Sequence, residues 1–209
     1  KVFYRACPKL SSHKNPMGSD KYEIVKNCFE SFKKNITTQE VEIISDGIPT
    51  DWYHIFKGFN VIKSPSGNVG SFHKQLDLAE KLDNEKVFLV EDDYLWATGA
   101  LDKIERALDE LDLVSPYDHP GHYIESRFRD EPKKMVLIDN QTYRQAPSNT
   151  LTFATHSSFI KENIEIMKSF GISDHPMFVA LGVEMYVPVP SLATHLVEHL
   201  LAPNVEWGV

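Results

Sequence analysis

The sequence predicts an α/β fold with a mainly parallel central sheet, and three observations support this class. Residues 87–90 form an unbroken apolar run, which is typical of a strand covered on both faces in a parallel sheet. Short apolar strands alternate with amphipathic helices through the first half of the chain. Carboxylates follow several of these strands, at the edge where open α/β sheets bind their ligands.

The first half of the chain predicts a βαβαβα arrangement. Asp20 followed by Glu23 is typical of a helix start, because both side chains can satisfy free backbone N–H groups there. Gly67 and Gly70 lie in a predicted turn over residues 64–70 and could present amides to a phosphate, although they match no defined phosphate loop. We expect strands at 2–4, 41–45, 61–62 and 87–90, and helices that begin after Asp20, near Phe72 and near Leu101.

The second half is less regular, and residues 119–144 are polar and aromatic. A helix over 160–167 should end at Gly171, and Ser173 or Asp174 can cap the next helix. We expect strands at 113–115, 135–138, 151–154 and 185–187. No repeat or linker divides the chain, so we expect a single domain over residues 1–209.

Composition excludes several functional classes. The 209 residues include 22 Lys plus Arg and 30 Asp plus Glu, and the resulting net charge of −8 argues against nucleic acid as the main partner. Cys7 and Cys28 are the only cysteines, which favours a reducing compartment and a cytoplasmic location. No apolar stretch approaches the roughly 20 residues of a membrane span. The chain opens with neither Met nor a signal peptide, so we expect a trimmed chain or one domain of something longer.

The acidic triplet Glu91, Asp92 and Asp93 follows the apolar run directly. Neighbouring carboxylates repel one another unless they are protonated or share a cation. Oxygen ligands of this kind suit Mg²⁺ or Mn²⁺ held together with phosphates. The triplet therefore predicts a site for a metal and a diphosphate, and the alternative interpretation is the start of a solvated loop.

The order of these motifs resembles the GT-A class of glycosyltransferases. The matching features are Asp46-Gly47 after an early strand, the triplet after a later strand, and a His near the C-terminus. The residues of the segments from VFYRACPKL to LVEDDYLW also resemble the compact glycosyltransferases encoded by large chlorella viruses. The resemblance implies a GT-A-like fold with a Rossmann-like nucleotide-binding half at about 1–115 and an acceptor-side half at about 116–209.

The resemblance further implies metal-dependent transfer of a sugar from a UDP-sugar donor to a carbohydrate acceptor, as by a hexosyltransferase. In the GT-A class an early Asp contacts the base, a DxD motif holds the ribose and Mn²⁺ or Mg²⁺, and a late His can complete the metal shell. The triplet here begins with Glu91 instead of Asp, so Asp93 and His195 are the expected metal ligands. The expected nucleotide contacts are Tyr4, Arg5, Asp46, Lys74, Glu91 and Asp92.

The acceptor side offers candidates for catalysis and sugar binding. Asp174 could act as the base that activates an acceptor hydroxyl if the reaction inverts the anomeric centre, and its alternative role is a helix cap. Asp118 is the second catalytic candidate, and it could line the sugar pocket with His119. Aromatic residues that could stack on sugar rings are Trp52, Tyr117, Tyr123 and Tyr143.

Three other functions are compatible with parts of the sequence. His195, Glu198 and His199 fit the HxxEH string of inverted zinc peptidases if the segment is helical. A nucleotidyltransferase would share the sheet and the carboxylates, but the segment 5–9 lacks the Gly-rich basic signature usual there. A nucleotide-sugar-binding module without turnover is the third. The identity of the sugar, the acceptor and the stereochemistry stay open.

Overall fold

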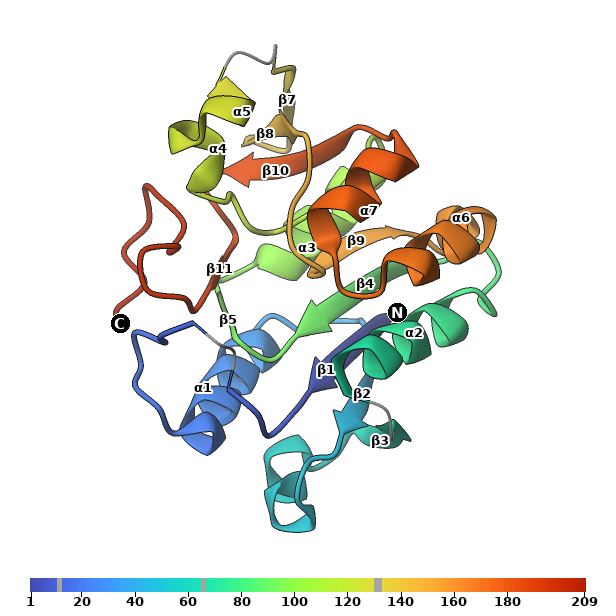
Figure 1. Cartoon of the computed structure of the whole chain (residues 1–209), viewed down its shortest axis with the longest axis vertical. Helices are drawn as coiled ribbons and strands as arrows, with labels where there is room; N and C mark the ends of the chain where they lie inside the picture. Colours follow the sequence, from blue (N-terminus) through green and yellow to red (C-terminus); the bar gives the residue numbers. More distant parts are fainter. Residues whose placement is uncertain (11–12, 65–66, 130–132) are drawn as a thin grey trace.

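The computed structural model describes residues 1–10, 13–64, 67–129 and 133–209. Within them, a large central sheet lies between two layers of helices (Figure 1). A small second sheet lies beyond the carboxyl end of a central strand of the large sheet. The strands are β1 (Val2–Ala6), β2 (Val41–Asp46), β3 (Asn60–Ser64), β4 (Lys86–Glu91), β5 (Tyr94–Trp96), β6 (Leu113–Val114), β7 (Met135–Ile138), β8 (Gln141–Ala146), β9 (Phe153–His156), β10 (Met185–Val189) and β11 (Ala193–His195). The helices are α1 (Lys21–Lys33), η1 (Thr50–Phe56), α2 (Gly67–Ala79), α3 (Ala100–Ala107), α4 (Gly121–Ile124), α5 (Ser126–Arg129), α6 (Ser157–Phe170) and α7 (Asp174–Leu181).

The described part of the large sheet has the strand order β3-β2-β1-β4-β9-β6-β10-β8-β7. The pairs β3–β2, β2–β1 and β1–β4 are parallel, as expected for a βαβαβα half. Strands β9 and β8 pair antiparallel with their neighbours. The α/β class with a mainly parallel central sheet is therefore confirmed.

Side chains of β1 alternate between the two faces of the sheet, as the pleat requires. Tyr4 belongs to the core under α1, where its ring packs edge-on against Phe29 with centroids 5.1 Å apart. Phe3 faces the opposite core, under α2. Tyr4 is fully buried, so the expectation that it contacts the nucleotide is wrong.

The N-termini of the first two long helices differ in how well the sequence predicted them. Asp20 caps α1 as expected, since its carboxylate accepts hydrogen bonds from the amides of Tyr22 at 3.0 Å and Glu23 at 3.4 Å. Helix α2 begins at Gly67, earlier than expected, and part of the predicted turn, residues 65–66, lies outside the described residues. Lys74 therefore lies about two turns inside α2 instead of in its first turn, away from the phosphate position assigned to it.

A small antiparallel sheet joins the acidic segment to the chain's last strand. Strand β5 pairs with β11 so that Tyr94 lies opposite His195. The sequence analysis did not anticipate this sheet, because each strand has only three residues. Helix η1 and strand β8 were not predicted either. Strand β8 carries polar side chains at most positions, so it lacks the apolar pattern of a buried strand. The small sheet positions His195 beside the triplet.

No helix in the described ranges is both long enough and apolar enough to cross a membrane.

We predict that Phe29→Ala lowers the free energy of unfolding by about 3–5 kcal/mol, because a fully buried aromatic ring leaves a cavity in the core under α1. Leu137→Ala is the matched control on an edge strand, where the side chain is 70% exposed, and it should change stability by less than about 0.5 kcal/mol. Urea denaturation of both variants measures the difference. Equal losses would contradict the assignment of this core.

Candidate functional site

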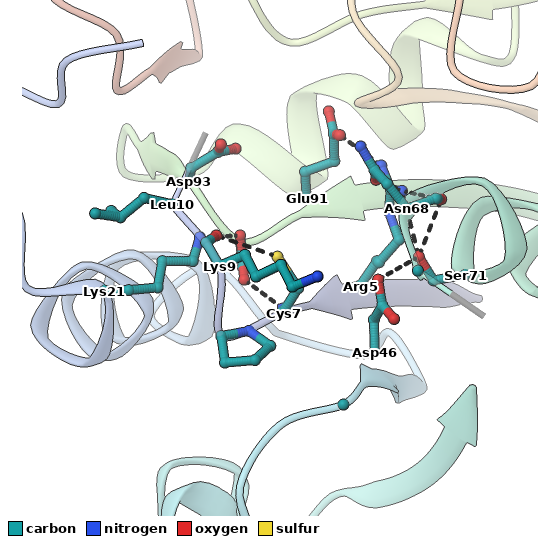
Figure 2. A pocket seen from close by; sticks show the side chains of 14 residues that line it. Arg5, Cys7, Lys9, Leu10, Lys21, Asp46, Asn68, Ser71, Glu91 and Asp93 are labelled. Atoms are coloured by element: carbon teal, nitrogen blue, oxygen red, sulfur yellow. Dashed lines mark hydrogen bonds and ion pairs between the residues drawn. The ribbon is translucent and has the colours of Figure 1, made fainter. Parts of the chain in front are cut away.

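A cavity of about 610 Å³ opens at the carboxyl ends of β1, β2 and β4 (Figure 2). This is the edge of the sheet at which ligands of open α/β folds bind, and the volume suits a small-molecule ligand. The lining comes from the strand ends, from the loop after β1 and from the first turn of α2. Its residues are Arg5, Cys7, Pro8, Lys9, Leu10, Lys21, Asp46, Gly47, Gly67, Asn68, Ser71, Glu91, Asp92 and Asp93.

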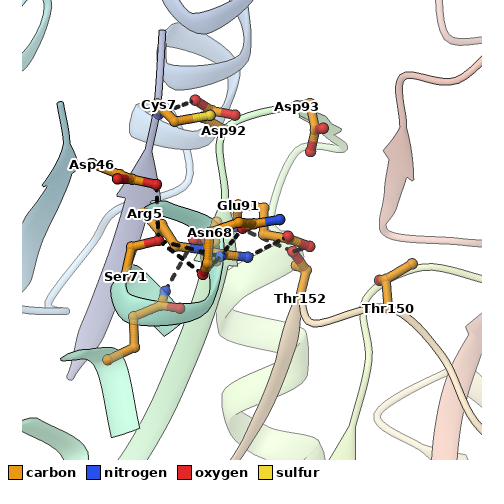
Figure 3. Close-up of polar contacts among 12 residues, drawn as sticks. Arg5, Cys7, Asp46, Asn68, Ser71, Glu91, Asp92, Asp93, Thr150 and Thr152 are labelled. Atoms are coloured by element: carbon orange, nitrogen blue, oxygen red, sulfur yellow. Dashed lines mark hydrogen bonds and ion pairs between the residues drawn. The ribbon is translucent and has the colours of Figure 1, made fainter. Parts of the chain in front are cut away.

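The side chain of Glu91 is held by a buried arginine. Arg5 Nη2 donates to Glu91 Oε1 at 2.5 Å, and Arg5 is only 4% exposed. Nη1 of the same guanidinium donates to the backbone oxygen of Asn68 at 2.8 Å. Burial raises the pKa of Glu91, against the opposing charge of Arg5. The pair therefore connects β1, β4 and the N-terminal turn of α2 (Figure 3).

Asp92 has protein partners on both carboxylate oxygens. Lys21 Nζ donates to Oδ1 at 2.7 Å, and the backbone amide of Cys7 donates to Oδ2 at 2.7 Å. Burial favours the neutral amine of Lys21, but the charge of Asp92 outweighs it and raises the lysine pKa. Burial, with Asp92 nearby, raises the pKa of Cys7 to about 12, so this thiol stays protonated. Asp92 thus fixes the loop after β1 against α1.

Asp93 faces His195, with His195 Nε2 and Asp93 Oδ2 3.2 Å apart. The backbone reinforces this contact, because the amide of Leu196 donates to the Asp93 carbonyl at 2.8 Å. The imidazole stacks on the ring of Tyr94 with centroids 4.9 Å apart. Asp93 Oδ1 is buried and has no hydrogen-bond partner in the described part of the chain. The protein therefore leaves one oxygen of this carboxylate unsatisfied within the described ranges.

The charges of this pair shift both pKa values. Burial opposes ionisation of Asp93, but the nearby positive charge of His195, with help from Lys21 and Arg5, lowers its pKa below the ordinary value. Burial likewise disfavours the charged imidazole, but Asp93 outweighs it and raises the pKa of His195. The pair is thus stabilised as carboxylate and imidazolium.

Asp46 lies at the end of β2 on the cavity wall. Ser71 Oγ donates to its Oδ2 at 3.2 Å and lies 3.1 Å from the Asn68 carbonyl oxygen. Asp46 is therefore linked to the same turn of α2 that anchors Arg5.

The structure brings together most of the residues predicted for the nucleotide and metal side. Arg5, Asp46, Glu91, Asp92 and Asp93 line one cavity, and His195 joins through Asp93. The sequence analysis missed Lys21, Asn68 and Ser71. Asn68 could have been predicted, because it is a polar residue in the first turn of a helix that follows a strand end. Lys21 gave no such signal, because a lysine after a helix cap is usually solvated.

Asp118 does not suit the catalytic role expected of it. Its side chain is 1% exposed, Arg144 Nη2 donates to Oδ1 at 2.5 Å, and Tyr123 Oη donates to Oδ2 at 2.5 Å. Both oxygens are therefore occupied in a buried ion pair that connects β8 to the segment before α4. Tyr117 and Tyr143 are buried in the core, so they cannot stack on a sugar, whereas Tyr123 is 44% exposed.

Asp174 is the first residue of α7, and Ser173 occupies the N-cap position. Its Oδ1 accepts a hydrogen bond from the His175 amide at 2.6 Å. Burial raises the pKa of Asp174, and the positive charge of His195 acts on it in the opposite sense. The hydrogen bond and the charge of His175 also oppose this rise in the pKa of Asp174.

The zinc-peptidase interpretation is wrong. His195 ends strand β11, and His199 has a left-handed backbone with φ of 70°, so the two side chains do not share one face of a helix. His199 is also 88% exposed. Among the described residues, no three His, Cys, Asp or Glu side chains converge as a set that could hold a metal.

Comparisons with solved structures show which fold this is. The bifunctional IspDF from Campylobacter jejuni matches with a TM-score of 0.52 and 14% identity, over 88% of this chain and 48% of that one. A nucleotidyl transferase from Methanothermobacter matches with a TM-score of 0.52 and 8% identity, over 88% and 85%. The galactosyltransferase LgtC, solved with donor and acceptor sugar analogues, matches with a TM-score of 0.52 and 11% identity, over 88% and 70%.

These matches confirm the GT-A-like fold. The present chain spans about half the length of IspDF. No protein-family model and no curated protein matches the sequence. The resemblance to chlorella virus enzymes stays a prediction from the sequence.

We predict that the Asp93–His195 pair stabilises the fold in a defined pH window. The lowered pKa of Asp93 stabilises above its ordinary value of 3.8, and the raised pKa of His195 stabilises below its ordinary value of 6.5. Both contributions are complete between these values. The His195 contribution is lost as pH rises through the raised pKa, and the Asp93 contribution is lost as pH falls.

The variant that tests this window is His195→Asn. It should lose about 1.5–3 kcal/mol near pH 5.5 and clearly less near pH 8.5, as for a hydrogen bond to a charged group. Chemical denaturation at both pH values measures the loss, with the exposed His199→Asn as control. A loss independent of pH would argue that the pair is not ionised.

Proposed function

We propose that this chain is a metal-dependent glycosyltransferase that transfers a sugar from a UDP-sugar to a carbohydrate acceptor with Mn²⁺ or Mg²⁺. The observation that carries the proposal is Asp93, which lines the cavity, pairs with His195 and keeps a buried carboxylate oxygen without a partner among the described residues. A divalent cation is the ligand that suits such an oxygen beside an imidazole.

The residues present fit a cation that is bound together with a diphosphate. Asp93 and His195 would be the two protein ligands, with the imidazole losing its proton when the cation binds. Phosphate oxygens and water would fill the remaining positions. The cation would act as a Lewis acid that stabilises the charge on the leaving diphosphate. The chain has a net charge of −8, so a bound cation would also reduce the repulsion of an anionic donor.

The other cavity residues have separate roles in binding the donor. Asp46 would accept a hydrogen bond from the N–H of uracil, and this contact would favour UDP over purine nucleotides. Arg5 would contact phosphate oxygens, which a guanidinium binds well. During transfer the bond between the anomeric carbon and the diphosphate oxygen breaks, and the acceptor hydroxyl forms the new bond at that carbon.

The acceptor hydroxyl must lose its proton in this step, and Asp174 is the proposed base if the reaction inverts the anomeric centre. Burial keeps the pKa of Asp174 above its ordinary value, which makes the carboxylate a better proton acceptor.

A nucleotidyltransferase is the second candidate, because the fold is shared with an enzyme of that name. In the present chain Lys21 is engaged by Asp92, and the segment 5–9 lacks the Gly-rich basic signature that is usual in nucleotidyltransferases. Glycosyl transfer is therefore the preferred proposal.

We predict that Asp93→Ala weakens UDP binding in the presence of Mn²⁺ by at least about 100-fold, because the cation loses a carboxylate ligand. UDP binding without metal should change little, and the variant should remain folded. Thermal-shift titration with UDP, with and without Mn²⁺, measures both. The control is Asp83→Ala, an exposed carboxylate away from the cavity. Unchanged Mn²⁺-dependent affinity in Asp93→Ala would refute the metal site.

We predict that a screen of nucleotide sugars with Mn²⁺ releases a free nucleoside diphosphate, with UDP-sugars as the preferred donors. Slow hydrolysis should be detectable even before the acceptor is known, since water can replace the acceptor hydroxyl. A nucleotidyltransferase would instead consume a nucleoside triphosphate and a sugar phosphate and release pyrophosphate. Donor binding with neither product would indicate a binding module without turnover.

A further inference from the structure

Three consecutive carboxylates at the end of β4 point to three different partners. Figure 3 shows Glu91 directed towards Arg5, Asp92 towards Cys7, and Asp93 away from both. Two of these carboxylates are occupied by protein cations, Glu91 by Arg5 and Asp92 by Lys21. At the proposed metal position, Asp93 and His195 can therefore act as ligands, whereas Glu91 is paired with Arg5.

Glu91 differs from Asp92 in how firmly it is held. Asp92 and Lys21 are almost fully buried, with side chains 6% and 8% exposed, whereas the Glu91 side chain is 22% exposed and lines the cavity. Its Oε2 has a long contact of 3.3 Å with Thr152 Oγ1. Of the two carboxylates held by protein cations, Glu91 is thus the one that a ligand in the cavity can reach.

Arg5 has a second anchor besides Glu91. Its Nη1 donates to the backbone oxygen of Asn68 at 2.8 Å, and this contact anchors the guanidinium at the first turn of α2. Arg5 is one of the residues that line the cavity, and its Nη2 group holds Glu91. An anion entering the cavity therefore competes with Glu91 for Nη2.

We propose that Arg5 is a positioning residue that controls whether Glu91 can bind the cation. Without nucleotide, Arg5 holds Glu91, and the cation has two protein ligands. When a nucleoside diphosphate binds, its phosphate oxygens take the Arg5 Nη2 group, and Glu91 is freed to join Asp93 and His195. Cation and nucleotide then strengthen each other's binding by the same factor. This inference rests on the proposed function.

The test is titration of the full chain with Mn²⁺, followed by electron paramagnetic resonance, with and without saturating UDP. In the natural sequence UDP should tighten Mn²⁺ binding by about tenfold or more. Arg5→Gln should bind Mn²⁺ alone about tenfold more tightly than the natural sequence, because Glu91 is released. The double variant Arg5→Gln with Glu91→Gln should lose this gain.

Lys9→Gln is the matched control. This substitution also removes one positive charge from the cavity wall. The backbone oxygen of Lys9 contacts Cys7 Sγ, and the substitution leaves that backbone contact unchanged. It should change Mn²⁺ affinity by less than about threefold, since an exposed charge is screened. Circular dichroism checks that each variant is folded. If Arg5→Gln does not fold, Glu91→Gln alone should keep the weak affinity for Mn²⁺ and show less tightening by UDP than the natural sequence, because only the phosphate oxygens then add ligands to the cation.

Two results would overturn the inference and leave the proposed function intact. One is an Arg5→Gln variant that binds Mn²⁺ no more tightly than Lys9→Gln, and the other is a gain that persists in the double variant. A natural chain that binds no Mn²⁺ even with UDP would overturn both the inference and the metal-dependent function.

Discussion

The cavity end of this fold depends on charge compensation for three carboxylates that follow a buried strand. A buried carboxylate without a partner is costly, because it has lost its hydration. Glu91, Asp92 and Asp93 are compensated by Arg5, Lys21 and His195 respectively. These partners come from β1, α1 and β11, so the need for compensation connects three elements that are distant in sequence.

The three pairs differ in burial, and the difference separates structural from functional roles. The Lys21–Asp92 pair is the most buried, and loss of either partner would leave an uncompensated charge inside the protein. It fixes the loop after β1, because the Cys7 amide shares the same carboxylate. The pairs of Glu91 and Asp93 are more exposed and face the cavity or its rim. The most buried pair thus lies between two carboxylates that are partly exposed.

Much of this end of the molecule could be predicted from the sequence, because its signals are local. Apolar runs locate strands, and parallel strands place the residues that follow them at one edge, so Arg5, Asp46 and Asp93 were found. Tyr4 was misplaced because the sequence does not say which face of β1 each side chain takes. Lys74 was misplaced because α2 begins earlier than its apolar pattern suggests.

Interactions between segments distant in the sequence could not be predicted, because no local pattern marks them. Asp118 looked like a free carboxylate after a strand, but its partner Arg144 lies 26 residues further on. Lys21 looked like a solvated helix residue, but it is buried against a carboxylate 71 residues away. The proximity of Asp93 and His195 was inferred from a family resemblance, and the short β5–β11 sheet that produces it has no clear sequence signal.

The pairing of β5 with β11 also bears on how the protein matures during translation. Asp93 and His195 are separated by 102 residues, so the imidazole leaves the ribosome well after the carboxylate. Until then a nascent chain carries the acidic turn without its aromatic partner, even if the parallel half has already formed. The cavity end of the sheet is therefore completed only after β11 has been synthesised, and chains that terminate before β11 would lack the partner of Asp93.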